Sequence, residues 1–211
     1  MIGRRYHEVV STPYEQTGGR VRQKERTRQD LLAAARALIA ESGAAPTVEQ
    51  AAARASVSRA TAYRYFPTRR ALLAAAHPET VSPSMLPPHV GDDPRQRLIA
   101  AVDRFTRTIV DTERQQRTML RLSVEAEADA ELPLRQGRAI AWFEEALEPL
   151  TPRWGASGVR TVAVAVRAVA GIEALVWLTD VAGLDRAAAR ALMCWNAAAV
   201  LDRALAEGPP S

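Results

Sequence analysis

Cysteine, lysine and aromatic residues are scarce in this chain, and their scarcity limits the classes of protein to which it can belong. Cys194 is the only cysteine, which excludes an internal disulfide framework and a cysteine-rich zinc module and favours a reducing compartment. Aromatic residues account for 5% of the 211 residues and apolar residues for 47%, with alanine in excess. Such a chain can bury a core in one or two domains, and its alanines favour closely packed helices.

The chain also lacks a long uninterrupted hydrophobic run. Its most apolar stretch, from Val159 to Leu178, contains Arg160, Arg167 and Glu173, and charges at that density are costly inside a bilayer. No apolar run follows the arginines near the N-terminus, so nothing there has the pattern of an export signal. We therefore expect a cytoplasmic protein that does not contact a membrane.

Residue patterns typical of catalytic sites are missing as well. His7, His77 and His89 fall in predicted loops, and the sequence contains no H-E-x-x-H, paired-cysteine or G-x-S-x-G pattern. The acidic residues between Glu125 and Glu131 are spaced by two, so they would spread around a helix rather than converge. We expect no enzymatic activity, no metal site and no cofactor.

Charge is distributed unevenly along the chain. Residues 1–76 carry a net charge of +7, residues 77–93 carry −3, and residues 94–211 are neutral, which gives +4 overall. Every basic residue except Lys24 is arginine. A basic first third joined to a neutral and apolar remainder predicts an anionic partner at one end and a different role for the other.

Proline and glycine crowd residues 77–93 and mark the one obvious boundary in the chain. We expect a flexible arm over residues 1–20, a domain over residues 21–76, a linker over residues 77–93 and a second domain over residues 94–211. Apolar residues recur at helical spacing and no credible hairpin interrupts them, so the predicted fold is all-α. The expected long helices are Glu25–Ser42, one from Pro94 behind an Asp93 cap, Glu113–Glu127, one from Pro133, Ser157–Thr179 and Asp185–Ala206.

The first domain contains a pattern of two short helices joined by a tight turn. Thr47 and Gln50 have the spacing of a capping box, which starts a short helix. Residues 55–57 fill a turn, and Ser58 can cap the next helix, which runs to about Phe66. This pattern indicates a helix-turn-helix, a unit whose second helix fits the major groove of DNA. A plain helical bundle with a solvated arginine face is the alternative interpretation.

Residues 47–73, TVEQAAARASVSRATAYRYFPTRRALL, resemble the DNA-binding domain of the TetR family of bacterial transcription regulators, and the likeness covers about residues 21–76. Three positions depart from the family pattern. Ala51 replaces a branched residue, Ser56 replaces the turn glycine, and Arg69 replaces a lysine. The resemblance is carried by Thr47, Ala52, Ala55, Val57, Ser58, Thr61, Tyr63, Tyr65, Phe66, Thr68, Arg69 and Leu72.

The candidate DNA-binding residues come from two arguments. Residue chemistry selects Arg59 and Arg64 for reading base edges, because the arginine fork matches O6 and N7 of guanine. Ahead of these helices, Arg20, Arg22 and Lys24 form a basic stretch that could reach DNA or remain a solvated arm. The resemblance implies phosphate contacts by Thr47, Tyr63, Tyr65 and Arg69, with Ser58 and Thr61 close to the backbone.

For the second domain the resemblance implies a homodimer and a ligand cavity. The dimer would be a four-helix bundle built from the last two helices of each copy, with Ala187, Ala188, Ala189, Ala191, Ala197, Ala198 and Ala199 allowing close approach and Leu192, Trp195 and Leu201 providing bulk. The alternative is that the last helix only closes the core of its own domain. Candidate ligand-binding residues are Phe105, Met119, Leu122, Trp142, Phe143, Arg167, Glu173 and Trp177. Arg167 and Glu173 each interrupt an apolar helix, and they could pair with neighbours, face the dimer seam or contact a polar ligand.

Together these features predict a ligand-responsive, DNA-binding transcriptional regulator. The resemblance favours a repressor that binds a palindromic double-stranded DNA operator as a dimer and is released by a small-molecule effector. The alternative is a nonspecific or architectural nucleic-acid-binding helical protein without a ligand. Such a protein would be expected to carry basic charge throughout, whereas residues 94–211 are neutral.

Overall fold

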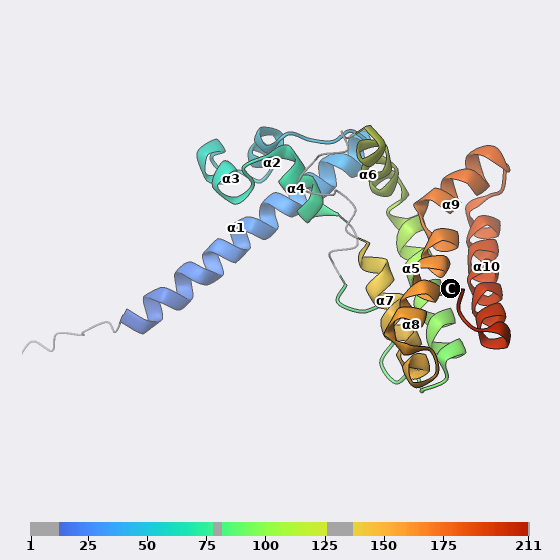
Figure 1. The fold of residues 1–211 in the computed structure, drawn as a ribbon. Helices are drawn as coiled ribbons and strands as arrows, with labels where there is room; N and C mark the ends of the chain where they lie inside the picture. The colour runs from blue at the N-terminus through green and yellow to red at the C-terminus, as the bar shows by residue number, and fades with distance from the viewer. Residues whose placement is uncertain (1–12, 78–81, 126–136, 211) are drawn as a thin grey trace, which may run out of the picture.

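The computed structural model describes residues 13–77, 82–125 and 137–210. Within these ranges the secondary structure is helical and contains no strand, so the all-α prediction is confirmed. The helices form two groups with separate hydrophobic cores (Figure 1). We call α1–α4 the N-terminal unit and α5–α10 the C-terminal bundle.

The N-terminal unit consists of α1 (Pro13–Ser42), α2 (Val48–Arg54), α3 (Arg59–Tyr65) and α4 (Arg69–Ala76). The side chains of Thr47, Ser58 and Thr68 accept backbone N–H groups at the starts of α2, α3 and α4, as the sequence predicted for Thr47 and Ser58. The capping box of Thr47 and Gln50 is complete in both directions. The core of the unit is made by Leu31, Leu32, Ala35, Val48, Ala51, Ala52, Ala62, Phe66, Leu72 and Ala76.

The first helix is longer than the sequence predicted. We expected it to begin at Glu25 behind a flexible arm, but α1 begins at Pro13, so residues 13–20 are helical. Its first half projects away from the other helices as a rod (Figure 1). Hydrophobic periodicity could not reveal this extension because the stretch before Leu31 is almost entirely polar. Residues 1–12 of the expected arm lie outside the described residues.

The turn between α2 and α3 places a serine in a conformation that glycine favours. Ser56 has φ of 54°, in the left-handed region. Its N–H donates to the Ala53 carbonyl at 3.2 Å, and the Val57 N–H donates to the Ala52 carbonyl at 2.9 Å. The turn geometry therefore survives the loss of the family's glycine, at the cost of backbone strain.

The C-terminal bundle contains α5 (Pro94–Asp111), α6 (Glu113–Glu125), α7 (Arg138–Leu147), a 3-10 turn η2 (Glu148–Leu150), α8 (Thr151–Ala170), α9 (Ile172–Val176), a π-helix η3 (Trp177–Val181) and α10 (Arg186–Glu207). Asp93 and Asp185 cap α5 and α10 as predicted. Helix α10 lies along the outer edge of the bundle, against α5 and α8 (Figure 1). The helix expected from Pro133 begins outside the described residues, and α7 starts at Arg138.

The helix predicted over Ser157–Thr179 is broken in the structure. Helix α8 begins earlier, contains a kink at Gly155, and ends at Ala170 before an extended Gly171. A Cβ on Gly171 would lie 1.6 Å from Nη1 of Arg167, so a larger residue at this position would displace that guanidinium. Hydrophobic periodicity does not mark this break, because apolar residues continue on both sides of it.

The described part of the expected linker is packed against the C-terminal bundle. Met85 is buried in the bundle core. The Trp142 indole N–H donates to the Pro83 carbonyl at 3.1 Å, and the Ser84 hydroxyl donates to Glu145 at 2.8 Å. Residues 82–86 therefore belong structurally to the bundle rather than forming a free connection.

Candidate functional site

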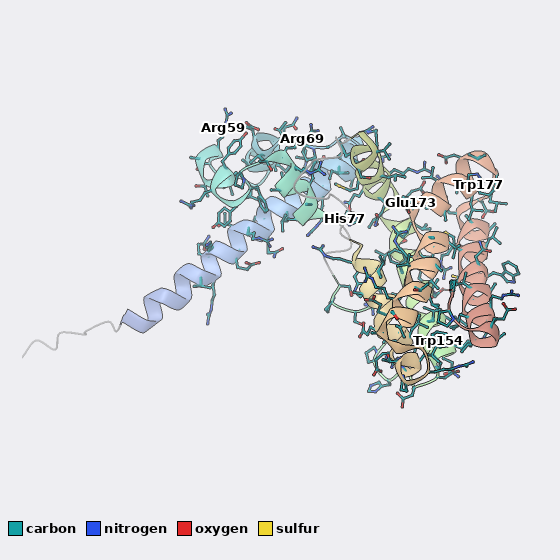
Figure 2. The ribbon with its side chains drawn as sticks, viewed as in Figure 1. Arg59, Arg69, His77, Trp154, Glu173 and Trp177 are labelled. Atoms are coloured by element: carbon teal, nitrogen blue, oxygen red, sulfur yellow. The ribbon has the colours of Figure 1, made fainter. Side chains whose placement is uncertain are left out.

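The outer face of α3 is exposed to solvent. Among the helix residues only Ala62 is buried, while the side chain of Arg59 is 73% exposed. Figure 2 shows Arg59 at the outer tip of the N-terminal unit, pointing away from its core. The second helix of the helix-turn-helix is therefore available to a partner along its length.

Three side chains form a polar cluster across α2 and α3. The Tyr63 hydroxyl donates to Oε1 of Glu49 at 2.6 Å. Nη2 of Arg59 lies 2.8 Å from the same oxygen, and the Arg59 guanidinium lies 5.7 Å from the centre of the Tyr63 ring. The Tyr63 hydrogen bond is the main reason that the pKa of Glu49 is lowered to about 2, and it raises the pKa of Tyr63. Glu49 is therefore a carboxylate at neutral pH.

The hydroxyl groups predicted to lie near phosphates are fixed at helix starts. Thr47 Oγ1 accepts from the Gln50 N–H at 3.2 Å. Ser58 Oγ accepts from the Thr61 N–H at 3.2 Å and donates to the Thr61 hydroxyl at 2.9 Å. These bonds hold the side chains at the exposed N-terminal ends of α2 and α3, where free N–H groups also favour an anion.

The remaining basic candidates differ in how they are held. Arg64 is exposed and its guanidinium lies 5.9 Å from the centre of the Tyr65 ring. Arg69 folds back onto the loop before α2, where Nε donates to the Pro46 carbonyl at 3.3 Å and Nη2 donates to the Ala45 carbonyl. Arg69 thus joins α4 to this loop in the free protein, a structural role that the sequence did not predict.

The arrangement defines a helix-turn-helix protein of the class that reads DNA with an exposed second helix. Residues 31–76 match the family model described as bacterial regulatory proteins, tetR family. The N-terminal unit therefore carries a DNA-binding domain of the TetR type, and this match supports a DNA-binding transcriptional regulator. No curated protein matches the chain.

The eight candidate ligand-binding residues do not form one site in the structure. Phe105, Trp142 and Phe143 pack together in the bundle core, with ring centres 6.1 and 5.5 Å from that of Phe105. Met119 and Leu122 instead contact the N-terminal unit, and Trp177 is 58% exposed (Figure 2). Helical spacing identified these residues as apolar positions but could not tell which face of each helix they occupy.

Arg167 and Glu173 pair with each other. Nη1 of Arg167 lies 3.1 Å from Oε2 of Glu173 across the break at Gly171. The Arg167 guanidinium also lies 5.7 Å from the centre of the Phe105 ring. Of the alternatives that the sequence left open, the structure shows pairing with a neighbour, at the edge of the aromatic cluster.

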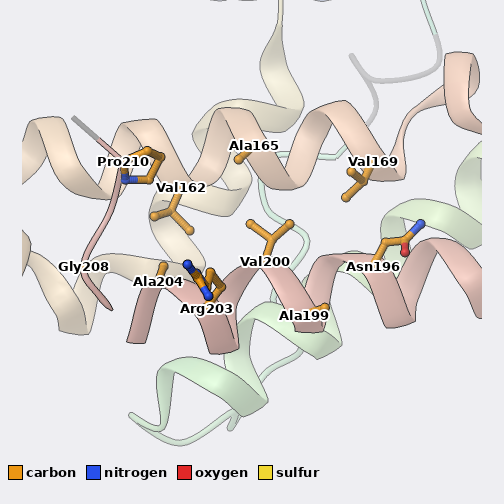
Figure 3. Close-up of a pocket in the computed structure, with 10 residues that line it drawn as sticks. All are labelled: Val162, Ala165, Val169, Asn196, Ala199, Val200, Arg203, Ala204, Gly208 and Pro210. Carbon is orange, nitrogen blue, oxygen red and sulfur yellow. The ribbon is translucent and has the colours of Figure 1, made fainter. Parts of the chain in front are cut away.

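A groove of about 490 Å³ lies between α8 and α10 (Figure 3), and none of the eight candidates lines it. The alanines of α10 divide between two faces. Ala189, Ala197 and Leu201 are buried in the bundle core, so their predicted place in a dimer surface is wrong. Ala188, Ala191 and Ala199 are exposed.

The groove between α8 and α10 is lined by Val162, Ala165 and Val169 of α8, by Asn196, Ala199, Val200, Arg203 and Ala204 of α10, and by Gly208 and Pro210.

Sequence reasoning missed two polar residues. Glu49 is the only acidic residue between positions 47 and 73, which was a signal available in the sequence. Gln116 is fully buried in α6, and neither atom of its amide has a hydrogen-bond partner among the described residues. Nothing in the sequence separates it from its neighbour Gln115, which donates to the Arg36 carbonyl at 3.0 Å.

Helix α6 connects the two groups of helices. Toward α1, Arg114 donates to the Ala40 and Glu41 carbonyls at 2.8 and 2.9 Å. Toward the end of the bundle, Arg117 donates to both carboxylate oxygens of Asp180 at 2.6 and 2.7 Å. These bonds, together with one from Thr179, lower the pKa of Asp180 to about 2. Helix α6 is therefore bonded both to the end of α1 and to η3.

The stretch Arg138–Val181 is long and apolar enough to cross a membrane by length and composition alone. In the structure its helices bend at Gly155 and Gly171 and supply core residues to the bundle. Among the described residues, no group of three or more His, Cys, Asp or Glu side chains is arranged to hold a metal ion.

Proposed function

We propose that the protein is a repressor that binds a palindromic operator as a homodimer and leaves it when a small-molecule effector binds the C-terminal bundle. The observation that carries this proposal is the exposed, capped helix α3 with Arg59 at its outer tip. A regulator of this kind works in the cytoplasm, where its DNA is, and needs no membrane contact.

On the operator, each residue of the exposed face has a proposed role. Arg59 and Arg64 read base edges in the major groove, because both are exposed on α3 and both carry a planar donor fork. Arg69 would have to keep its carbonyl contacts while using its remaining N–H groups on a phosphate. Phosphate contacts are proposed for Thr47, Ser58, Thr61, Tyr65 and Arg69, whereas Tyr63 would have to give up its hydroxyl bond to Glu49 to make one.

The dimer is proposed to form through α8 and α10. Trp195 is 67% exposed, and Ala188, Ala191 and Ala199 recur with it at helical spacing along the outer face of α10. Val164 on α8 is also exposed. Together with the groove between the two helices, this exposed apolar surface supports packing against a second copy. Two copies would present two recognition helices to successive major grooves.

The effector is proposed to bind beside the aromatic cluster of Phe105, Trp142 and Phe143. The Arg167–Glu173 pair at its edge and the buried amide of Gln116 supply polar groups in the same bundle. Helix α6, which carries Gln116, also holds the end of α1 through Arg114. An effector that favours another position of α6 would therefore change the spacing of the two recognition helices.

The proposal is tested by selecting binding sites from random duplexes and measuring competition by an unrelated duplex of equal length. We expect a palindromic selected site that is preferred by roughly a thousandfold or more. Light scattering should give a dimer of the 23.0 kDa chain at working concentration. Equal affinity for both duplexes would instead support the nonspecific or architectural binder. A lone monomer would contradict the dimer.

A further inference from the structure

A carboxylate lies between two of the candidate DNA-binding side chains. Glu49, on the first turn of α2, places one oxygen 2.6 Å from the Tyr63 hydroxyl and 2.8 Å from Nη2 of Arg59. The Glu49 side chain is 35% exposed, so it lies at the surface that α3 presents. An anion at this position opposes the binding of a polyanion and requires an explanation.

The fold does not depend on Glu49 for its core or for its principal helix cap. Helix α2 is capped by Thr47 and Gln50, and it is anchored by the buried side chains of Val48, Ala51 and Ala52. A carboxylate in the first turn stabilises a helix only modestly, by about 0.3–1 kcal/mol. The cluster with Arg59 and Tyr63 is therefore the feature that distinguishes this residue.

The effect of Glu49 on Arg59 depends on which DNA group approaches. A phosphate that approaches Arg59 comes close to the Glu49 carboxylate, and two anions at that range repel each other. The O6 and N7 atoms of guanine belong to a neutral base and meet much less repulsion. Arginine has five N–H donors, so it can keep one bond to Glu49 while offering others to guanine. The pair thus favours a base edge over the backbone.

We propose that Glu49 is a positioning residue that determines specificity: its carboxylate holds Arg59 over the Tyr63 ring and keeps phosphates away from it. Arg59 then contributes to binding mainly when a guanine is present at its position. This inference rests on the proposed function, because it requires that α3 reads DNA. It assigns to an acidic residue the discrimination between specific and nonspecific binding.

The test uses Glu49→Gln, which removes the charge and keeps an oxygen acceptor for Tyr63. The matched control is Glu41→Gln, because Glu41 pairs with Arg54 at 2.6 Å in the same unit and its loss changes net charge equally. Dissociation constants are measured for the selected operator and for an unrelated duplex across a salt series. Thermal unfolding of both variants checks that they remain folded.

For Glu49→Gln we expect tighter binding to the unrelated duplex, by roughly fivefold or more, and a salt dependence steeper by about 0.9 for each released Arg59 that gains a phosphate. Operator affinity should stay constant or fall, so the preference for the operator should drop by at least about fivefold. Site selection with this variant should lose guanine at the position read by Arg59 and keep the other positions. Glu41→Gln should change both affinities by the same small factor.

A uniform change on both duplexes, equal to that of Glu41→Gln, would overturn this inference while leaving the proposed function intact. A preference that rises in Glu49→Gln would overturn it as well. The double variant Glu49→Gln/Arg59→Ala provides a further check, because the charge change should have no effect on preference once Arg59 is absent. A wild-type protein without any sequence preference would overturn the proposed function itself, and the two failures are therefore distinguishable.

Discussion

The N-terminal unit and the C-terminal bundle expose different kinds of side chain. In the unit, Arg59 and Arg64 point to solvent from a helix with a single buried residue. In the bundle, several arginines pair with carboxylates on other helices, as Arg117 does with Asp180, while large apolar side chains such as Trp177 and Trp195 are exposed. A surface of available cations suits a polyanion, and an exposed apolar face suits another protein surface.

The two regions also differ in how their arginines are paired with carboxylates. The cation of Arg59 is held by one carboxylate that lies at the same surface, so the contact can be exchanged when DNA approaches. Arg117 is held from both sides, by Glu113 on its own helix and by Asp180 on η3. A single exposed pair suits a recognition surface, whereas an arginine held by two carboxylates fastens α6 to η3.

The largest expected effect comes from placing a charge on the apolar face of the bundle. Ala199→Arg sets a second cation beside Arg203, in the groove between α8 and α10. If this face packs against a second copy, the variant becomes monomeric. Operator affinity then falls by roughly a thousandfold, because the two recognition helices are no longer linked and bind the DNA independently. Light scattering and competition binding measure both effects.

The control for this change is Ala141→Arg. Ala141 is exposed on α7 and does not line the groove between α8 and α10. It should leave the dimer and operator affinity unchanged. A dimer that persists in Ala199→Arg would show that this face is not the seam.

Removing Arg59 should have the next largest effect, and it falls on the other region. Arg59→Ala removes the guanidinium proposed to read a base from each copy of the dimer. Each such arginine–guanine contact contributes about 1–3 kcal/mol of discrimination between bases. We expect operator preference to fall by roughly a hundredfold or more, while salt-dependent binding to unrelated DNA remains. An equal loss on every duplex would instead make Arg59 a phosphate contact. Arg54→Ala is a suitable control, because Arg54 pairs with Glu41 away from α3.

Most of the N-terminal unit could be predicted from the sequence, and much less of the bundle could. Local signals determine the helix-turn-helix: the caps Thr47 and Ser58 and the small Ala52 act within a few residues of themselves. In the bundle, Arg167 and Glu173 pair across the break at Gly171, a contact that no local pattern shows. The apolar faces of α6 and α10 could be found by periodicity, but not the partner of each face.

The candidate DNA-binding site also has a part that the sequence could predict and a part that it could not. The exposed face of α3 follows from the spacing of Ser58, Arg59 and Arg64 on a capped helix. The Glu49 cluster spans two helices, so predicting it would have required knowledge of the angle between α2 and α3. Arg69 looked like a free cation in sequence, because its carbonyl partners lie more than twenty residues earlier in the chain.

Replacing the buried amide of Gln116 is expected to have an effect of intermediate size, on the stability of the bundle. Gln116→Leu should stabilise the protein by about 1–3 kcal/mol, because it removes a buried polar group that has no partner among the described residues. The neighbouring Gln115→Leu should not, since Gln115 donates to the Arg36 carbonyl at 3.0 Å. Chemical denaturation measures both. Destabilisation by Gln116→Leu would show that its amide is satisfied in solution.

Acid titration should distinguish the exchangeable contact of Glu49 from an ordinary surface carboxylate. The pKa of Glu49 is lowered to about 2 from an ordinary value of 4.5, first of all by the Tyr63 hydrogen bond. The cluster therefore stabilises the folded state above about pH 4.5, and this contribution is lost as the pH falls toward 2. Tyr63→Phe should move the pKa of Glu49 part of the way back toward 4.5, as followed by carboxyl NMR. Tyr65→Phe should leave it in place, since Tyr65 contacts Arg64 instead.

The smallest expected effect concerns the turn that joins α2 to α3. Ser56 has φ of 54°, which a side chain disfavours and glycine adopts freely. Ser56→Gly should raise the free energy of unfolding by about 0.5–1 kcal/mol, partly offset by the greater freedom of glycine in the unfolded chain. Ser58→Ala, two residues later, should lower it by about 1 kcal/mol because it removes the cap of α3. Denaturation should therefore show changes in the free energy of unfolding with opposite signs for the two variants. That result would show that the Ser58 cap stabilises the turn while the backbone conformation of Ser56 destabilises it. A loss of stability in Ser56→Gly would mean that the serine side chain contributes more to the turn than its backbone conformation costs.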